Sequence, residues 1–486
     1  MKPVRLAVLN THPIQYFAPF YRVLDQSPRI EPTVLYLSNF GLRGGQDPGF
    51  GASVAWDIDL LDGYTSLFVG PADARTPRGF FSLIATGLWT ELTSGRYDAV
   101  LIHGHNFAAN WIALAAARAV GLTVLVRGDS HPELARGALK AALRRPLVRF
   151  FYRRCDRCLA IGSRNADFYR ELGVPEERIV LAPFAVNNEH FASAASDAVE
   201  RARVRRMLNI HSNAPAVLFV GKFTRQKRPG DLVEASICLK RAGASPFHLV
   251  LCGAGELDEA LRQRCAAAGL DNVTFTGFVN QSTLPAIYAA CDVFALPADG
   301  EESWGLAVNE AMAAGLPVVV SRQVGCAVDL VADGVNGFLP PCGDIDAWSQ
   351  ALSRLIADPA LRAAQARASL ERISRWSYRE CLEGFQRALC EAVAPPRRGS
   401  GPRSTKTSPH AESERRNVMS VTTHAFEPAL AQRASLCARH ADQPPVGLLH
   451  IDGRGLGAAF DRFNAIAGRS RRKANAGVDK VAARWS

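Results

Sequence analysis

The sequence predicts an α/β protein built from two doubly wound parallel sheets, and three observations support this prediction. Short apolar runs alternate with helical patterns along most of the chain, which is typical of parallel strands joined by crossover helices. The chain has 486 residues, too many for a single hydrophobic core, and 48% of them are hydrophobic. The alternation ends near residue 394, where the composition becomes polar and basic.

The predicted strands fall into two series. The first comprises residues 5–9, 33–37, 99–103, 123–126, 158–161 and 179–182, and the second comprises residues 216–220, 248–252, 273–276, 293–296 and 317–320. Ligands of such sheets bind beyond the carboxyl ends of the strands. We therefore expect two Rossmann-like halves that face each other across a cleft, with the chemistry in that cleft.

Composition shifts give the predicted boundaries. We predict an N-terminal domain over residues 1–190, a second domain over 191–375 that opens with a charged helix at 195–209, a helix at 376–394, and a tail at 395–486. The tail begins with Pro, Arg, Gly and Ser and carries 16 Lys and Arg against 7 Asp and Glu, so we expect it to be largely disordered. Most of the net charge of +11 belongs to this tail, so the high basicity does not indicate nucleic-acid binding by the folded part.

Cysteine usage and hydropathy indicate a cytoplasmic protein. The 11 cysteines are scattered through apolar segments, which favours reduced thiols. The single Cys-x-x-Cys pair, Cys155 and Cys158, lacks a second pair and is explained by packing. No apolar run approaches the eighteen or so residues of a membrane span, and the first ten residues resemble a strand rather than a signal segment.

The segment 299–321 carries the most informative motif. Two carboxylates, Glu302 and Glu310, stand eight residues apart around a short helix that opens at Gly305 and is followed by a buried strand. A helix start with little side-chain bulk exposes backbone N–H groups that can receive a diphosphate. Carboxylates repel phosphate, so the two glutamates are better suited to sugar and ribose hydroxyls.

This motif, with Trp304-Gly305 before the helix and Ala311-Met-Ala-Ala-Gly-Leu-Pro317 after the second glutamate, resembles the signature of the GT4 family of retaining glycosyltransferases. The resemblance covers residues 1 to about 394. It implies a GT-B fold whose last helix crosses back to the first domain. It also implies transfer of a sugar from a nucleotide-diphosphate sugar to an acceptor hydroxyl, on a glycan, a lipid-linked glycan or a small molecule. A nucleotide-sugar epimerase or hydrolase, and a non-catalytic binding scaffold, are the alternatives.

Two lysines five residues apart, Lys222 and Lys227, follow the strand that ends before Gly221 and suit a diphosphate, although surface lysines would give the same pattern. The resemblance assigns both to the donor. The predicted donor-binding set is Gly221, Gly253, Val279, Ser303, Trp304, Gly305, Leu306 and Glu310, and the predicted catalytic set is Glu302, Lys222, Lys227 and Asp129. Core packing would equally explain Val279, and helix capping explains Asp344 and Asp346. We predict no metal requirement and no cofactor besides the donor.

Polar residues at other strand ends predict the acceptor side of the cleft. His12, Gln15 and Tyr16 follow the first strand, where similar proteins often carry a glycine pair, and His105 and Arg127 follow two later strands. Asp129 could orient or deprotonate the acceptor hydroxyl with Arg127 neutralising it, or it could cap the next helix. The pair His103 and His105 could face a metal, but no third ligand is evident.

Residues 136–157 form a basic stretch. Arg136, Lys140 and Arg144 recur every four residues, as do Arg145, Arg149, Arg153 and Arg157, with Leu147 and Phe150 among them. Such a face is typical of contact with an anionic membrane surface, and a solvated helix face is the alternative. The predicted location is therefore cytoplasmic, with peripheral contact at the inner face of the cell membrane.

Overall fold

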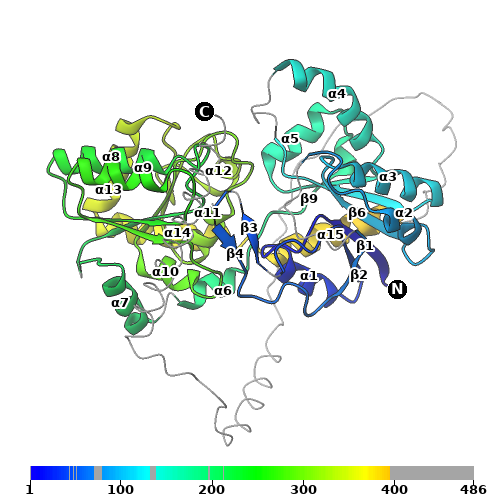
Figure 1. The fold of residues 1–486 in the computed structure, drawn as a ribbon, viewed down its shortest axis with the longest axis horizontal. Coiled ribbons are helices and arrows are strands. Elements are labelled where there is room, and N and C mark those ends of the chain that lie inside the picture. Colours follow the sequence, from blue (N-terminus) through cyan, green and yellow to red (C-terminus); the bar gives the residue numbers. More distant parts are fainter. Residues whose placement is uncertain are drawn as a thin grey trace, which may run out of the picture. The chain divides into compact units, whose positions relative to one another are not determined.

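The computed structural model describes residues 2–42, 44–47, 49–50, 52–70, 79–131, 138–194, 197–211 and 213–393. Within these residues two parallel sheets are covered by helices on both faces, so the predicted α/β class with two doubly wound halves is confirmed (Figure 1). The predicted tail lies outside the described residues.

The first sheet has seven strands in the described part of the chain, in the order β5 (Thr65–Phe68), β2 (Ile30–Tyr36), β1 (Val4–Asn10), β6 (Ala99–His103), β7 (Thr123–Arg127), β8 (Arg157–Ala160) and β9 (Ile179–Leu181). One face packs on α2 (Thr86–Leu92), α3 (Ala108–Val120), α4 (Ala138–Arg153) and α5 (Ser163–Glu171), and the other on α1 (Ala18–Asp25) and α15 (Tyr378–Val393). The strand order reverses between β1 and β6, and in such sheets ligands bind at this reversal.

The second sheet has the order β12 (Val273–Gly277), β11 (His248–Cys252), β10 (Ala216–Val220), β13 (Val293–Leu296), β14 (Val318–Val320) and β15 (Gly337–Phe338). One helix layer holds α8 (Pro229–Arg241), α9 (Asp258–Ala267) and α13 (Ile345–Ala357), and the other holds α6 (Asn188–Ser193), α7 (Ala198–Met207), α10 (Leu284–Ala290), α11 (Leu306–Ala313) and α14 (Pro359–Ile373) (Figure 1). The short α12 (Ala327–Leu330) follows β14. The central strands are buried apart from the last residue of β10, Val220, as expected for apolar runs in a covered parallel sheet.

Several short elements carry no clear signal in the sequence. The edge strands β5 and β15, the hairpin β3 (Gly45–Asp47) and β4 (Ala52–Val54), and the 3-10 turn Glu176–Arg178 were not predicted. Each is too short to show a periodic pattern. The charged helix expected at 195–209 is α7, which begins after Asp197, whose side chain accepts from the backbone N–H of Glu200.

Helix α15 lies against β7, β8 and β9 of the first sheet, although its sequence follows the second sheet. Its inner face contributes Cys381, Phe385 and Leu389 to the first half's core. The side-chain amide of Gln386 donates to Ser27 Oγ at 3.1 Å. The chain therefore passes between the halves twice, at residues 182–187 and again before α15.

Candidate active site

The carboxyl ends of β1, β6 and β7 meet at one edge of the first sheet because these neighbouring strands run parallel. Beyond β1, the Thr11 hydroxyl lies 2.9 Å from His12 Nδ1, and the His12 ring meets Phe40 edge-on at 5.2 Å between centroids. Gln15 and Tyr16 follow in the loop before α1, each partly buried. The strand reversal thus carries the predicted His12, Gln15 and Tyr16 cluster.

The two histidines after β6 have different neighbours. His103 stacks on Phe17 at 5.0 Å and its Nε2 lies 3.3 Å from the Tyr21 hydroxyl. His105 is buried, with Nδ1 3.1 Å from the Tyr152 hydroxyl. The idea that both face a shared metal is wrong, and no cluster of three His, Cys, Asp or Glu suited to a metal exists in the described part of the chain.

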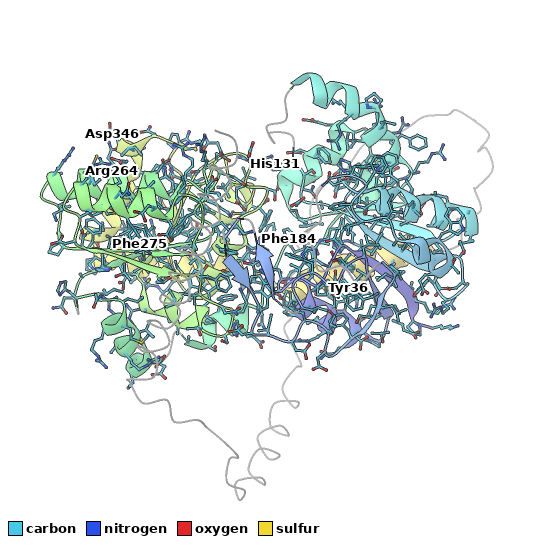
Figure 2. All side chains as sticks on the ribbon, in the orientation of Figure 1. Tyr36, His131, Phe184, Arg264, Phe275 and Asp346 are labelled. Carbon is cyan, nitrogen blue, oxygen red and sulfur yellow. The ribbon has the colours of Figure 1, made fainter. Side chains whose placement is uncertain are left out.

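Arg127 and Asp129 diverge at the end of β7. The Arg127 guanidinium is buried, donates to the carbonyls of Ala182 and Pro183 at 3.1 Å each, and lies 4.8 Å from the Phe184 ring centroid. The predicted neutralisation of Asp129 by Arg127 is therefore wrong, because the guanidinium faces the segment 182–187 that joins the halves. Phe184 of this segment is labelled in Figure 2.

Asp129 is exposed and reaches the second half instead. Its Oδ2 accepts a hydrogen bond from the hydroxyl of Ser303 at 3.1 Å. Ser303 immediately follows Glu302 in the predicted motif, so the predicted acceptor carboxylate lies beside the predicted donor loop. The alternative reading of Asp129, as a cap of the next helix, involves residues 132–137, which lie outside the described residues.

The glycines of the donor half are explained by close packing of two loops. Gly221 and Gly253 have φ of 156° and 150°, and a Cβ on Gly253 would stand 1.8 Å from the Gly221 carbonyl oxygen. The Phe223 N–H donates to the Ala254 carbonyl at 2.8 Å across the same contact. Only glycine at position 253 allows this approach, which brings the loops after β10 and β11 together.

Each of the two predicted diphosphate lysines has an identified contact. Lys227 Nζ forms an ion pair with Glu302, and both side chains are largely buried. Lys222 Nζ lies 4.8 Å from the centroid of the Phe50 ring, a cation–π contact that comes from the first half. The structure therefore brings Lys227 and Glu302 together, as the motif implies for a shared site.

Glu310 is completely buried within α11. The Tyr288 hydroxyl donates to its Oε2 at 2.7 Å, while its buried Oε1 makes no hydrogen bond of good geometry with the described residues. Burial raises the pKa of Glu310 to about 7, against the lowering effect of Tyr288, Tyr16 and Lys227. Burial also raises the pKa of Tyr16, and the charge of Glu310 adds to that, so the Tyr16 hydroxyl lies close to this carboxylate.

Trp304, Gly305 and Leu306 at the start of α11 are positioned mainly by packing and by backbone conformation. The Trp304 ring is buried, its indole N–H donates to Asn309 Oδ1 at 2.9 Å, and it packs against Trp376 at 5.3 Å, so only the Trp304 backbone can face a ligand. Gly305 caps the helix with φ of 92°, where a side chain would be strained. Leu306 opens the helix and is partly buried.

A connection between residues 50–57 and the loop after β12 was not predicted. Asn280 Nδ2 donates to the Ala55 carbonyl at 2.7 Å, the Ser282 N–H donates to Asp57, and Phe50 and Trp56 meet Phe278 edge-on. Val279, the predicted base contact, is partly buried beside Phe278 and packs against the second half's core. No local signal could have revealed contacts between residues more than 200 positions apart.

The basic stretch 136–157 maps largely to α4. Arg144, Arg145, Arg149 and Arg153 are exposed on α4, as are Leu147 and Phe150 at 61% and 50%. Arg136 lies outside the described residues, and Arg157 lies in β8, so the prediction of one helical row reaching Arg157 is wrong. The helix ends at Arg153 because the chain turns into a buried strand.

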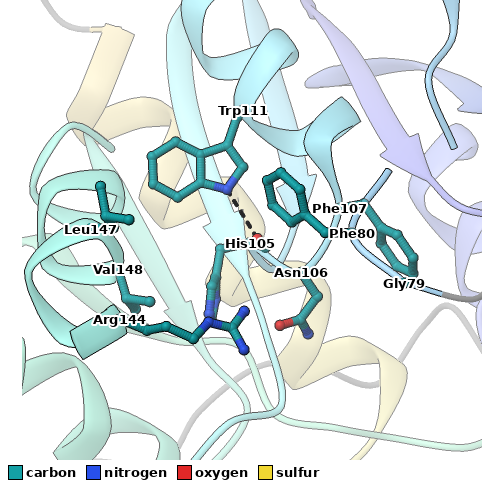
Figure 3. Close-up of a pocket in the computed structure, with 9 residues that line it drawn as sticks. All are labelled: Gly79, Phe80, His105, Asn106, Phe107, Trp111, Arg144, Leu147 and Val148. Atoms are coloured by element: carbon teal, nitrogen blue, oxygen red, sulfur yellow. Dashed lines mark hydrogen bonds between the residues drawn. The ribbon is translucent and has the colours of Figure 1, made fainter. Parts of the chain in front are cut away.

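A pocket of about 700 Å³ lies between α3, α4 and the loop after β6. Figure 3 shows the residues that line it. Its walls comprise Gly79, Phe80, His105, Asn106, Phe107, Trp111, Arg144, Leu147 and Val148. Of the predicted site residues only His105 lines it. The indole N–H of Trp111 donates to the His105 carbonyl at 3.1 Å.

Two family models match the chain. "Glycosyl transferase 4-like domain" matches residues 45–185 and "Glycosyl transferases group 1" matches residues 200–372. A "D-inositol 3-phosphate glycosyltransferase" of Salinispora arenicola is 30% identical over 330 residues, covering 64% of this chain and 72% of the relative. A "2-deoxystreptamine glucosyltransferase" of Streptomyces kanamyceticus is 32% identical over 287 residues, covering 57% and 73%.

Solved structures share the fold. HepE of Anabaena, crystallised with UDP and glucose, superposes with a TM-score of 0.62 at 18% identity, covering 80% of this chain and 100% of that one. A sucrose-phosphate synthase of Thermosynechococcus elongatus gives a TM-score of 0.61 at 18% identity, covering 80% and 99%. Two facing doubly wound halves of this kind form the GT-B fold. The chain belongs to the group 1 glycosyl transferases with a GT4-type domain pair, and the predicted class of enzyme is confirmed.

None of the helices in the described part of the chain combines the length and hydropathy that a membrane-spanning segment requires.

Proposed function

We propose that this glycosyltransferase moves a sugar from a nucleotide-diphosphate sugar to an acceptor hydroxyl with retention of anomeric configuration. The observation that carries the proposal is the junction of Lys227, Glu302 and Ser303 with Asp129 at the start of α11. Cationic, carboxylate and backbone donor groups thus lie between the strand ends of both halves. The retaining course follows from the GT4-type pair.

The donor would displace the present ion pair. In the bound state Lys227 and Lys222, with the N–H groups that follow Gly305, would hold the diphosphate as it leaves the anomeric carbon. Glu302, released from Lys227, would accept hydrogen bonds from sugar hydroxyls. The buried Oε1 of Glu310, which makes no hydrogen bond of good geometry with the described residues, supports a role as acceptor for a donor hydroxyl, such as one of the ribose.

The acceptor would approach from the first half. Asp129 is exposed at the end of β7 and is held by Ser303, so it can orient the acceptor hydroxyl or accept its proton. The acceptor oxygen bonds to the anomeric carbon as the bond to the diphosphate breaks, and contacts between the halves exclude water. His12, Gln15, Tyr16 and His105 complete this side of the proposed cleft.

We also propose that transfer needs no metal ion, because lysine side chains and a helix start can neutralise the diphosphate. Turnover that is unchanged after chelation with EDTA supports this. Restoration of lost turnover by added Mg²⁺ or Mn²⁺ would contradict it.

The exposed α4 supports a further part of the proposal, contact of residues 136–157 with an anionic membrane surface. Arginines and the exposed Leu147 and Phe150 share this helix, and residues 138–155 contain no Asp or Glu. The protein should sediment with phosphatidylglycerol vesicles and not with phosphatidylcholine vesicles. Equal sedimentation with both kinds of vesicle would contradict the proposed contact with an anionic membrane.

Calorimetry with UDP-, GDP-, ADP- and TDP-linked sugars tests the donor proposal, followed by product analysis with each sugar that binds. Binding of one donor and transfer to an acceptor with retention supports the proposal. Consumption of the donor with an acceptor present but no glycoside formed would instead indicate a hydrolase or an epimerase. Absence of heat with every donor, for folded protein, would overturn it.

A further inference from the structure

The pocket between α3 and α4 is mostly apolar. Phe80, Phe107, Trp111, Leu147 and Val148 form most of its wall, and the Trp111 N–H is already used by the His105 carbonyl. A pocket that held a free oligosaccharide would need several directed donors and acceptors. Here the polar side chains of the wall are His105, Asn106 and Arg144 (Figure 3).

One wall residue of the pocket, His105, follows the strand next to the one that precedes Asp129. His103 pairs with Arg127 in the sheet, so His105 and Asp129 each stand two residues beyond paired positions on neighbouring strands. The Tyr152 hydroxyl lies 3.1 Å from His105 Nδ1. Burial raises the pKa of Tyr152, and the charge of Asp129 makes a smaller contribution in the same direction. The His105 end of the pocket and Asp129 therefore lie beyond the carboxyl ends of neighbouring strands at the same edge of the first sheet.

The surroundings of the pocket are apolar and cationic. Phe81 is 72% exposed and meets the pocket residue Phe80 edge-on at 4.9 Å between ring centroids. Leu147 belongs to the wall and is also exposed, and Phe150 lies one turn further along α4. Arg144 faces the pocket on the same side as His105 and Asn106 (Figure 3). This combination complements a molecule that joins an apolar chain to an anionic group.

We propose that the α3–α4 pocket binds the apolar chain of an anionic, lipid-linked acceptor, with Arg144 facing its phosphate. The inference rests on the proposed glycosyl transfer and narrows its acceptor to one class. The acceptor would slide from the membrane surface on α4 into the pocket with its sugar or polar end toward Asp129. The apolar chain of the acceptor would then need no second binding site.

Decyl phosphate, below its micelle concentration, is the binding probe, and methyl phosphate and decyl glucoside are its matched controls. We expect decyl phosphate to bind the full-length protein at least tenfold more tightly than either control. Methyl phosphate lacks the apolar chain, and decyl glucoside lacks the negative charge. Quenching of tryptophan fluorescence should accompany binding because Trp111 lines the pocket. Equal affinity for methyl phosphate and decyl phosphate would overturn the proposal.

Variants locate the binding. Leu147→Gln should weaken decyl phosphate and decyl glucoside about tenfold, and Arg144→Gln should weaken only decyl phosphate, about tenfold. Leu370→Gln and Arg375→Gln are matched controls, since both side chains are exposed in the second half, and they should change neither affinity. Unchanged binding in both pocket variants would overturn the assignment to this pocket, and an unchanged melting temperature excludes misfolding as the cause of a loss.

The acceptor role itself is tested by transfer. With a donor that binds, decyl glycosides should be better acceptors than methyl glycosides of the same sugars, and Leu147→Gln should remove that preference. Equal kcat/KM for decyl and methyl glycosides would overturn the proposal. Donor binding in calorimetry separates the two failures, because a protein that binds decyl phosphate but no nucleotide sugar contradicts the proposed function and not the pocket.

Discussion

The two halves of the molecule hold their site residues in different ways. In the second half Glu310 is buried and bonded to Tyr288, and the largely buried Glu302 and Lys227 pair with each other. In the first half Asp129 is exposed, and the pocket wall includes the exposed Leu147 and Arg144. A preorganised donor half suits one fixed chemical group, the diphosphate, whereas an open acceptor half can be adapted to different acceptors.

The largest effect should come from breaking the donor half's ion pair. Lys227→Ala removes a cation from the departing diphosphate and leaves Glu302 partly buried without its partner. We expect a loss of roughly 3 to 4 kcal/mol of transition-state stabilisation, or about 10²- to 10³-fold in kcat/KM. Lys240→Ala is the matched control, since this exposed lysine pairs with Asp271 in the same half. Near-normal turnover of Lys227→Ala would show that the pair is only structural.

The second prediction concerns how much Arg127 stabilises the junction between the two halves. Arg127→Ala would leave the carbonyls of Ala182 and Pro183 without their buried donor and should lower the free energy of unfolding by roughly 2 to 3 kcal/mol. Urea unfolding measures this. Arg387→Ala, which removes an exposed bond to the Leu181 carbonyl, should cost less than about 1 kcal/mol. A similar loss in both variants would argue against a special role for Arg127.

The third prediction concerns the pH dependence of stability, which the buried Glu310 of the second half should change. Burial raises its pKa to about 7 from 4.5, so between these values the folded state holds a proton that the unfolded state releases. The folded state is therefore favoured below pH 4.5, and this advantage is lost as the pH rises toward 7. Between pH 5 and 7.5 the wild type should lose on the order of 2 kcal/mol relative to Glu310→Gln.

Parallel urea titrations of both proteins across this range measure the difference. Identical pH dependence would mean that Glu310 ionises normally in the fold.

The smallest effect should come from the contact between the halves. Asp57→Ala removes the acceptor of the Ser282 N–H and hydroxyl, which are exposed, so we expect about 1 kcal/mol, seen as a several-fold rise in KM for the donor with little change in kcat. Asp62→Ala, at a nearby exposed position, is the control. A fall in kcat with unchanged KM would place Asp57 in the chemical step instead.

Local patterns were sufficient for most of the fold. Continuous apolar runs such as 216–220 and 248–252 are recognisable because buried parallel strands have no polar face. Asp344 was correctly predicted to cap a helix, since its side chain accepts from the Ala347 N–H. The strand β15 has two residues and no pattern, so its place beside β14 depends only on pairing with that strand.

The site was only partly predictable. The motif placed Glu302, Gly305 and Glu310 in order along the chain, but it could not show that Glu302 pairs with Lys227, which depends on how the loops after β10 and β13 meet. Residues two apart on a strand share a face, so spacing suggested that Arg127 faces Asp129. Instead, hydrogen bonds to the carbonyls of residues 182–183 hold the guanidinium away. The pocket around Trp111 and Leu147 has no motif because its walls come from separate helices.

The sequence by itself determined the two-sheet architecture, the motif that carries Glu302 and Glu310, and membership in the glycosyltransferase family, because strand hydrophobicity, glycine turns and motif spacing are local properties of the chain. Only the tertiary structure decided which groups meet, such as Ser303 with Asp129 and Lys222 with Phe50. These contacts join residues more than 170 positions apart, and their geometry depends on the packing of both cores, which no local pattern records.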